Sequence, residues 1–439
     1  MKKAISILLS LCLVTTFTAC GNKDSSKTNS NSAQKVKVTY WHTTPIGDPG
    51  YAKINNLVKK FNESQDKVEV KHIGYSFWDY WDKLNIIVAA KNGSAPDIGI
   101  NTIDNSISRA ETGLIYNLSP LIKKDNINLG EFYQNQIDFG TYKGEVYSLP
   151  FTSTARVLYY NLDLFEKAGL TEADVPKNLE ELSKVAKKLD KVDGNGNIEV
   201  MGFDPTAGEG SYHGWLWTNG LDFFNKDLNP TLDDDKHEEV LRWMRDFNKN
   251  LTPKQKQGFS EGNKLVGLDP FTSGRMGMYL GSDSLHYTLT QKKVKFKYGV
   301  VNIPYPAGGT RVNWGSGFSL EMFNNGDEKK KEAAWEFYKF LMSPGAQKEY
   351  YETTGWLMSN KKAMEETAKN DKVLARIVEE LPYAKDKIYV NYAPSWHAND
   401  WQQYYQKALK EGTDEVREAL KEAQKYYLQK RENFKATQK

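Results

Sequence analysis

Residues 36–42, VKVTYWH, begin a series of alternating strands and helices that decides the fold class. The apolar residues of this stretch alternate with polar ones, as in a β-strand. Residues 54–61 then place apolar side chains at i, i+3, i+4 and i+7, which is typical of one helix face. Residues 67–75 predict a second strand, residues 77–88 a second helix, and residues 96–100, PDIGI, a third strand. This order predicts an α/β domain with a parallel sheet.

The N-terminal region predicts export. Two lysines precede a short apolar run at residues 4–14, and small residues follow, so we expect a signal peptide over residues 1–20. The apolar run is too short to span a bilayer, which needs about 20 apolar residues. The residues that end at Cys20 resemble a bacterial lipobox, which implies a lipid anchor on Cys20. A plain signal peptide is the alternative. Residues 21–35 are polar and read as a disordered tether.

The composition limits the possible functions. The chain has 439 residues, enough for two domains, and its 26% charged and 39% hydrophobic residues are typical of a globular protein. The net charge is only +3, with lysines interspersed among acids, so nucleic acid is not expected as a partner. Both cysteines, Cys12 and Cys20, lie in the export region, so the mature protein has no thiol nucleophile and no thiolate metal site. We expect no cofactor and no metal.

Further patterns extend the α/β reading along the chain. Lys143-Gly144 predicts a hairpin before a strand in residues 148–161. Helical spacing recurs at residues 179–189 and 240–247, so a second α/β unit is expected. Residues 193–199, DGNGNIE, invite a calcium interpretation, but the glycine and glutamate of an EF-hand loop are not in place, which favours a glycine-rich hairpin.

The ordered motifs resemble a family, the bacterial extracellular solute-binding proteins of ABC importers, in the group of maltose- and glycerol-phosphate-binding proteins. The similarity runs from about residue 35 to the C-terminus. The stretches that carry it are VTYWH, GSAPDIGI, LPFTSTARVLYYNLDLFEKAGL, FTSGRMGMYLGSDS, YGVVNIPYPAGG and TGWLMSNKKAM.

The resemblance implies a two-lobe periplasmic-binding-protein fold, with a hinge of crossing strands and a ligand cleft between the lobes. Residues 36–153 plus 316–370 would form lobe 1, and residues 154–315 plus 371–432 would form lobe 2. Hinge closure around the ligand is the motion expected of such proteins.

The same resemblance implies a function. The protein would be a monomer, held at the extracellular face of the bacterial cytoplasmic membrane, that captures a carbohydrate and delivers it to the permease subunits of an ABC transporter. Glycerol phosphate or another anionic solute is the alternative ligand, and Arg156 and Arg311 keep it open. A secreted glycoside hydrolase is the rival class, but we find no G-x-S-x-G, H-E-x-x-H or P-loop motif, and the ordered motifs favour a binding protein.

Several ligand positions follow from the resemblance, each with a structural alternative. Asp104 and Asn105 match a position where relatives bind sugar hydroxyls, although both residue types also cap helices. Ser153 and Thr154 lie on an expected crossing strand and could instead bond local backbone.

The end of the first strand supplies three more candidates, Trp41, His42 and Thr43. No second histidine or carboxylate stands at metal-ligand spacing from His42, so a single hydrogen bond to ligand is the modest expectation.

The aromatic stretch SYHGWLWTNG, residues 211–220, matches a segment where relatives stack rings on sugar faces. Tyr212 and Trp215 are the positions that the resemblance assigns to ligand, with a packed interior tryptophan as the alternative for Trp215. Trp217 lies off their shared face in a short helix and is expected in the core.

The resemblance also implies a ligand position in each of three later regions, without choosing the residue. The candidates are Ser282, Asp283, Ser284, Trp314, Gly315, Ser316, Trp396 and Trp401.

Overall fold

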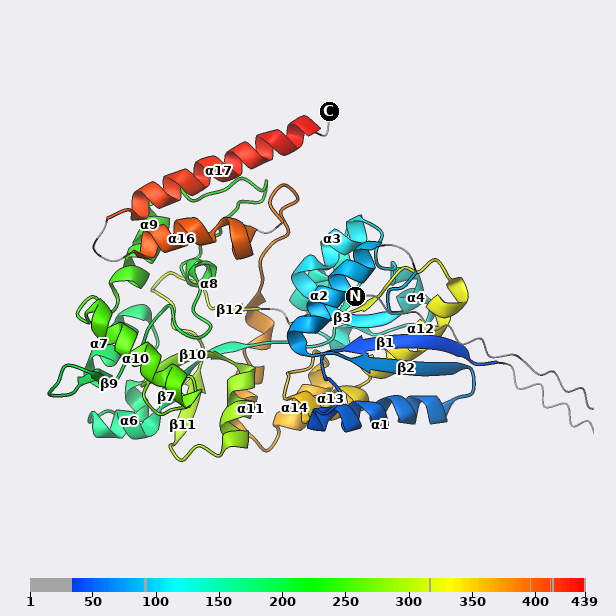
Figure 1. The fold of residues 1–439 in the computed structure, drawn as a ribbon, viewed down its shortest axis with the longest axis horizontal. Helices are drawn as coiled ribbons and strands as arrows, with labels where there is room; N and C mark the ends of the chain where they lie inside the picture. Colours follow the sequence, from blue (N-terminus) through cyan, green and yellow to red (C-terminus); the bar gives the residue numbers. More distant parts are fainter. Residues whose placement is uncertain are drawn as a thin grey trace, which may run out of the picture. The chain divides into compact units, whose positions relative to one another are not determined.

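The computed structural model of the protein describes residues 34–437, except residues 91, 92, 316, 395, 411 and 413 (Figure 1). The expectations for the signal peptide, for Cys20 and for all but the end of the tether therefore lie outside the described residues, as does Ser316. None of the described helices is both long enough and apolar enough to cross a membrane.

The first sheet has five strands in the order β2-β1-β3-β13-β6. β2 and β3 flank β1 and run parallel to it, as the sequence predicts, and β13 returns antiparallel to β3 with Phe318 opposite Thr102. We call the part of the protein built around this sheet lobe 1. The strands are β1 (Val36–His42), β2 (Val68–Gly74), β3 (Ile98–Thr102), β6 (Leu149–Pro150) and β13 (Phe318–Met322).

Helix α1 (Pro49–Ser64) shows how local sequence features determine where a helix begins and which of its faces is buried. Asp48 caps it by accepting a hydrogen bond from the N–H of Gly50, and a proline occupies the first helical turn, where no N–H is needed. The apolar residues predicted to share a face are those that are buried, together with Gly50. The other helices of lobe 1 are α2 (Phe77–Ala90), α3 (Ser106–Glu111), α4 (Ser119–Lys124), α5 (Gln134–Phe139), α12 (Glu328–Met342), α13 (Pro344–Thr354) and α14 (Lys361–Ala368).

The second sheet has three strands, and its outer strands β10 (Met278–Ser282) and β11 (Tyr298–Val301) both run antiparallel to the central strand β7 (Arg156–Asn161). We call the part around this sheet lobe 2. Its helices are α6 (Leu162–Lys167), α7 (Leu179–Leu189), α8 (Tyr212–Thr218), α9 (Asp235–Asp246), α10 (Pro253–Val266), α11 (Asp283–Lys292), α15 (Lys372–Val378), α16 (Gln402–Leu409) and α17 (Val416–Thr437).

The chain passes between the lobes more than once, as Figure 1 shows. The first crossing runs from β6 through residues 151–155 to β7. The second runs from β12 (Asn313–Trp314) to β13, and β12 pairs in parallel with β14 (Ala384–Lys385). The third runs from α14 to α15; these two helices contact each other, and α15 packs on β11 and α11.

Two small hairpins confirm the turn predictions. β4 (Thr141–Tyr142) pairs with β5 (Glu145–Val146) around Lys143 and Gly144, which both have positive φ, as a tight hairpin turn requires. β8 (Lys191–Val192) pairs with β9 (Ile198–Val200), and the Asp193 carboxylate accepts hydrogen bonds from backbone N–H groups within the turn. The short helical turns are Ile103–Asn105, Leu129–Glu131, Glu172–Asp174, Leu381–Tyr383 and Trp396–Asp400.

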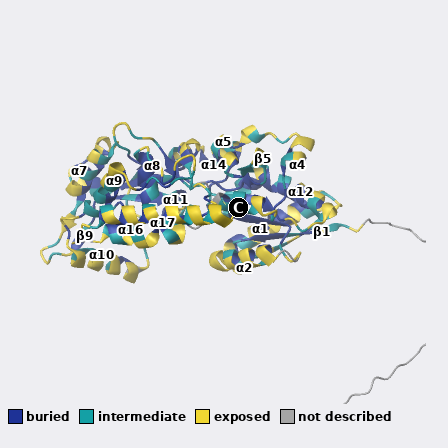
Figure 2. Cartoon of the chain, turned by 90° about the horizontal axis from the view of Figure 1, so that it is seen from above, coloured by how far each residue is buried: buried dark blue, intermediate teal, exposed yellow. Residues whose placement is uncertain are grey.

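Buried residues lie along the strands and on the inward faces of the helices, and exposed residues lie on the outside (Figure 2). The buried apolar residues form two clusters, one centred on β1, β3 and α12, the other on α8, α9 and α17. The first cluster continues across the crossings onto one face of the lobe 2 sheet, through Val157, Tyr159 and Val300, and the second cluster packs on its other face, through Leu158 and Tyr160.

Gly317→Ala is expected to lower the free energy of unfolding by roughly 2 to 4 kcal/mol, because it combines strain with a clash. Gly317 has φ +85°, and an added Cβ would lie 2.2 Å from the carbonyl oxygen of Thr152 on the neighbouring crossing. Gly326→Ala is the matched control: φ is +73°, but nothing lies within 4 Å of an added Cβ. Urea unfolding should show only about 1 kcal/mol for the control; equal losses would disprove the clash.

Candidate ligand-binding site

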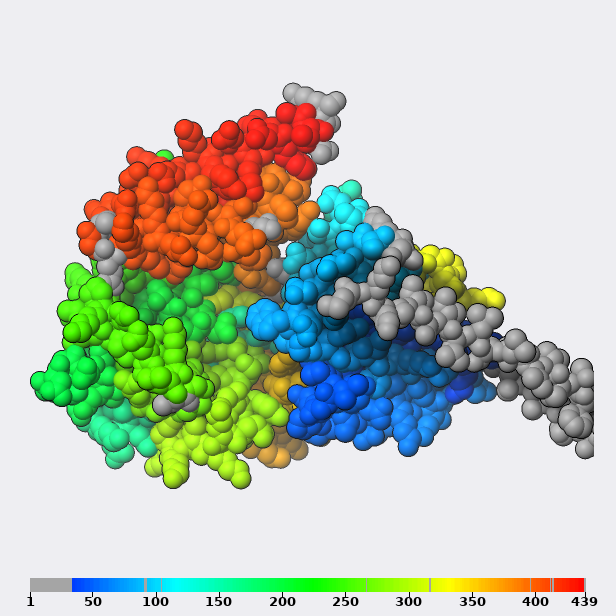
Figure 3. Space-filling view, viewed as in Figure 1, coloured from blue at the N-terminus to red at the C-terminus, as the bar shows by residue number. Residues whose placement is uncertain are grey.

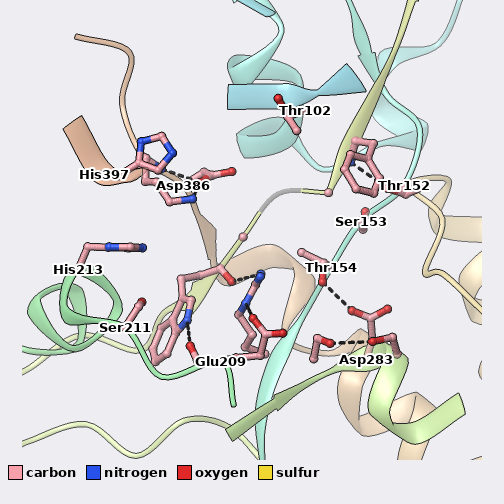
Figure 4. Close-up of a pocket in the computed structure, with 18 of the residues that line it drawn as sticks. Thr102, Thr152, Ser153, Thr154, Glu209, Ser211, His213, Asp283, Asp386 and His397 are labelled. Atoms are coloured by element: carbon pink, nitrogen blue, oxygen red, sulfur yellow. Dashed lines mark hydrogen bonds and ion pairs between the residues drawn. The ribbon is translucent and has the colours of Figure 1, made fainter. Parts of the chain in front are cut away.

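A cleft of about 620 Å³ lies between the lobes, where the crossing segments meet (Figure 3, Figure 4). Most of its lining comes from loops at strand ends and from the crossings. The lining residues are Thr102, Asn105, Thr152, Ser153, Thr154, Arg156, Gly208, Glu209, Gly210, Ser211, His213, Trp217, Ser282, Asp283, Ser284, Trp314, Gly315, Gly317, Phe318, Trp356, Asp386, Lys387 and His397.

Asp283 connects the first crossing to a segment of lobe 1 at the base of the cleft. Its Oδ1 accepts hydrogen bonds from the hydroxyl of Thr154 (2.7 Å) and the backbone N–H of Ala155 (3.1 Å). Its Oδ2 accepts from the backbone N–H of Leu357 (3.4 Å), in the lobe 1 segment between α13 and α14. Burial raises the pKa of Asp283, and these three hydrogen bonds oppose the rise. The carboxylate therefore holds the hinge backbone from both sides.

Arg156 and Glu209 form an ion pair in the wall of lobe 2. Nε of Arg156 donates to the Glu209 carboxylate at 2.9 Å, and Nη1 donates to the carbonyl oxygen of Trp314. The indole N–H of Trp314 in turn donates to the backbone carbonyl of Glu209 at 2.9 Å. Gly315, with φ +118°, leaves room for this arginine, since an added Cβ would lie 1.7 Å from Nη1. The guanidinium is thus committed to protein partners.

Two neutral imidazoles stand at one end of the cleft, as Figure 4 shows for His213 and His397. Burial, together with the nearby cation of Lys387, lowers the pKa of His213 to about 3. Burial and the same lysine lower the pKa of His397 to about 4, against the influence of Asp386. A neutral imidazole carries one donor and one acceptor, which suits hydroxyl groups.

Aromatic rings of lobe 1 line the opposite wall. Phe318 and Trp356 lie with ring centroids 5.2 Å apart at 45°. Trp81 supports Phe318 at 5.3 Å, and Phe77 contacts both lining rings at 6.3 Å. Phe77 is exposed and Trp81 is half-buried, and neither lines the cleft; both pack behind its aromatic wall.

The family model for bacterial extracellular solute-binding proteins matches residues 56–377, which is more than two thirds of the chain. The chain belongs to this family. The expectation of a binding-protein family from the sequence is confirmed, as is the two-lobe fold.

Relatives of this solute-binding protein bind different ligands. The sn-glycerol-3-phosphate-binding periplasmic protein UgpB of Brucella abortus is 25% identical over 366 residues, 78% of this chain and 79% of the relative. Among solved structures, mannotriose-bound CpMnBP1 has a TM-score of 0.73 at 24% identity, covering 90% of this chain and 100% of the other. Maltose-bound MalE3 of T. maritima has a TM-score of 0.71 at 21% identity, covering 89% and 99%.

The cleft of this solute-binding protein brings together eight of the residues predicted from the sequence. Asn105 is the N-cap residue of α3, but its side chain makes no capping hydrogen bond; it donates to Thr102 Oγ1 at 2.9 Å. The capping alternative for Asn105 therefore does not hold, while the Asp104 side chain lies outside the described atoms. The eight are Asn105, Ser153, Thr154, Ser282, Asp283, Ser284, Trp314 and Gly315.

The side of α8 that faces the cleft is not the side predicted from the sequence. Tyr212 and Trp215 are 2% and 0% exposed, and the Trp215 indole donates to the carbonyl of Pro205. His213 and Trp217, four residues apart, line the cleft instead. The ring-stacking role of Tyr212 and Trp215 is therefore corrected, whereas Trp217 is 4% exposed in the lobe 2 core, as predicted, and also lines the cleft. Gly214 is needed for packing, since an added Cβ would lie 2.5 Å from the Trp314 ring.

Other predicted aromatic positions also pack in the interior. Trp401 is 2% exposed and stacks on Tyr212 at 5.0 Å. Trp396 is 2% exposed and donates to the carbonyl of Ile388. Trp41 is 6% exposed and contacts Tyr75 at 4.8 Å. None of these rings is among the described cleft-lining residues, and neither is Thr43. Burial of a large apolar surface places them in the cores.

His42 is fully buried in a hydrogen-bonded chain and does not reach the cleft. The N–H of Thr44 donates to its Nδ1 at 3.2 Å, so the imidazole proton lies on Nε2, which donates to Nδ1 of His72 at 2.9 Å. His72 then donates from Nε2 to Asn55 at 3.2 Å. Both imidazoles are neutral in this chain, and burial lowers the pKa of His42 to about 3.

Acidification from neutral pH to pH 5 is expected to remove about 2 kcal/mol of unfolding free energy through His42 alone. Its pKa is lower in the folded state, about 3, than the ordinary 6.5 of the unfolded chain. The unfolded state therefore binds more protons below pH 6.5, and stability falls as pH falls. Urea unfolding at several pH values should show a shallower fall for His42→Gln than for the wild type; parallel slopes would contradict this.

Several cleft residues were not predicted as ligand positions. Arg156 and Trp356 lie within the motifs that carry the family resemblance, so those motifs contained the available signal. Phe318 and Glu209 carry no pattern of their own, because a ring at a strand start and an acid in a loop are common. The remaining unpredicted polar positions are Thr102, Thr152, Ser211, His213, Asp386, Lys387 and His397.

Proposed function

We propose that this solute-binding protein captures a neutral carbohydrate, an oligosaccharide, in the interlobe cleft and delivers it to the permease of an ABC importer. The observation that carries the proposal is the charge arrangement of the cleft. All five charged side chains among its described lining residues have protein partners. Arg156 pairs with Glu209, Lys387 with Asp386 at 3.4 Å, and Asp283 accepts three hydrogen bonds. Such a cleft offers hydrogen bonds but no unpaired cation for an anionic ligand.

The other lining groups suit a sugar. Pyranose rings have an apolar face and a rim of hydroxyls, so they need flat rings together with donors and acceptors. Phe318 and Trp356 supply the rings from lobe 1, and His213 with serine and threonine hydroxyls supplies polar contacts. The similar structures named above hold mannotriose and maltose, which supports the same ligand class here.

Glycerol phosphate is the second candidate, because UgpB is a relative. A phosphate dianion needs cations that are not already neutralised. The described lining has two cationic side chains against three carboxylates, and Arg156 and Lys387 are both paired. The geometry therefore favours the neutral ligand.

The remaining parts of the proposal concern where the protein acts. We propose lobe 1 as residues 36–153 plus 316–370 and lobe 2 as residues 154–315 plus 371–432. Lipidation of Cys20 would anchor the monomer at the extracellular face of the cytoplasmic membrane. Ligand binding would favour the closed state by its higher affinity for it, and the permease would recognise the closed lobes. No hydrolysis of the bound sugar is expected.

Calorimetry of the protein from residue 34 onward tests the ligand class. The panel is mannose and maltose oligosaccharides of increasing length, glycerol 3-phosphate and a neutral peptide, each incubated and then assayed for released reducing ends. Binding of a saccharide without hydrolysis supports the proposal. Binding of glycerol 3-phosphate alone would replace it with the anionic candidate, and new reducing ends would replace it with the hydrolase.

Trp356→Ala is expected to weaken the bound saccharide by about 2 kcal/mol, roughly 30-fold in Kd, because the lobe 1 wall loses its largest ring. Trp78→Ala is the matched control, since Trp78 is 77% exposed on α2 and does not line the cleft. An equal effect of both changes, measured by calorimetry, would refute the role of the Trp356 ring.

A further inference from the structure

A second hollow of about 590 Å³ opens on lobe 2 beside the cleft. Trp217 and Asp386 line both spaces, so the hollow continues the cleft instead of standing apart from it. Trp217 contacts His213, a cleft residue, with ring centroids 5.3 Å apart. Its ring also lies 5.4 Å from Nζ of Lys385, a residue of the hollow. The two spaces are therefore separated by little more than the side chains that they share.

The floor of the hollow is aromatic and firmly packed. Phe223 and Trp396 lie with centroids 4.5 Å apart, and Phe224 contacts them at 5.0 and 5.2 Å. These rings are buried except for the surface that they offer to the hollow. Since core packing holds the rings in place, an apolar floor exists before any ligand arrives.

The rim of the hollow is polar, and its formal charges cancel. Three lysines and three aspartates of the described residues line it, and Lys385 pairs with Asp222 at 2.6 Å. His237 adds no charge near neutral pH, because burial lowers its pKa to about 4. An apolar floor with a rim of donors and acceptors suits a sugar, as the rings and polar groups of the cleft do. The six rim residues are Asp222, Lys226, Asp234, Lys236, Lys385 and Asp386.

We propose that this hollow is a second carbohydrate subsite, which holds the part of an oligosaccharide that extends out of the cleft past Trp217 and Asp386. The inference rests on the proposed function, since the ligand must be a saccharide in the cleft first. It adds that the ligand is longer than the cleft and that lobe 2 carries the extension. Chain length then raises affinity, because each further sugar reaches new apolar and polar contacts.

Calorimetry with mannobiose against mannohexaose, and maltose against maltohexaose, tests this subsite. Lys226→Trp places a large ring at the exposed rim and should weaken the hexasaccharide tenfold or more while leaving the disaccharide unchanged. Lys249→Trp, at an exposed position of lobe 2 outside the hollow, is the matched control and should change neither. A second variant, Asp222→Ala, removes a rim acceptor whose exposed ion pair contributes little to folding.

The outcomes separate the two proposals. If the wild type binds saccharides but both rim variants affect disaccharide and hexasaccharide alike, or not at all, the subsite is overturned while the cleft stands. Equal wild-type affinity for the short and long sugars overturns the subsite as well. If the wild type binds no saccharide of either series, the proposed function itself fails, whatever the variants do.

Discussion

Arg109→Ala is expected to lower the free energy of unfolding by about 3 to 5 kcal/mol, because it leaves a buried carboxylate without its cation. Glu321 lies in the middle of the lobe 1 sheet, and its side chain is fully buried. Arg109 donates to Oε2 from Nε at 2.8 Å and to Oε1 from Nη2 at 2.5 Å. Ser106 and Ser319 also donate to Oε1, but these neutral hydroxyls cannot balance the charge.

The effect should reach the cleft. Arg109 also donates to the carbonyl of Thr102, at the end of β3, where the cleft residues Thr102 and Asn105 lie. Urea unfolding measures the loss of stability, and Lys184→Ala serves as control, since its ion pair with Glu180 is exposed and contributes little to folding. The double change Arg109→Met with Glu321→Leu should recover most of the loss; no recovery would show that the unpaired charge is not the cause.

Asp283→Ala is expected to cost about 3 kcal/mol of unfolding free energy and to abolish measurable ligand binding, because three donors at the hinge lose one acceptor. The N–H groups of Ala155 and Leu357 belong to fully buried residues, so water cannot readily replace the carboxylate. The first crossing and the lobe 1 segment that Asp283 joins would then no longer be held in one arrangement. Binding requires both lobes to be held in the arrangement that forms the cleft, so the affinity for ligand should fall together with the stability.

A conservative change separates these contributions. Asp283→Asn keeps one oxygen for Thr154 and Ala155, but its NH₂ group would face the N–H of Leu357, so an intermediate loss is expected. Asp79→Ala, an exposed aspartate on α2, should leave stability within about 0.5 kcal/mol. Thermal unfolding and calorimetry on the three variants check the order; an asparagine variant as impaired as the alanine variant would place the effect in the charge itself.

Local sequence patterns were enough to predict the helices, strands and turns discussed here. The i, i+3, i+4, i+7 spacing in α1 and the alternation in β1 depend only on neighbouring residues, and the structure buries the faces that they predict. The turn at Lys143-Gly144 is equally local, because two positive φ angles there need no distant partner. The order of these elements was enough to recognise the family, since an ordered set of motifs is more specific than any one of them.

The sequence predicted the cleft-lining residues less well than it predicted the helices and strands. In SYHGWLWTNG, Tyr212 with Trp215 and His213 with Trp217 each share a helix face, and both faces carry an aromatic ring. The pattern offers no basis for choosing between them. The structure decides, because α9 and α16 cover Tyr212 and Trp215 while the cleft stays open beside His213 and Trp217.

The sequence by itself thus determined the family, the order of strands and helices, and which residues lie near the crossings, since these depend on short-range periodicity and on motif order. Only the tertiary structure decided the chemistry of the site. The Arg156–Glu209 pair spans 53 positions, and Asp283 bonds Thr154 across 129. Whether a charge in the cleft is neutralised depends on such distant partners, which come together only when the crossings bring both lobes to one place.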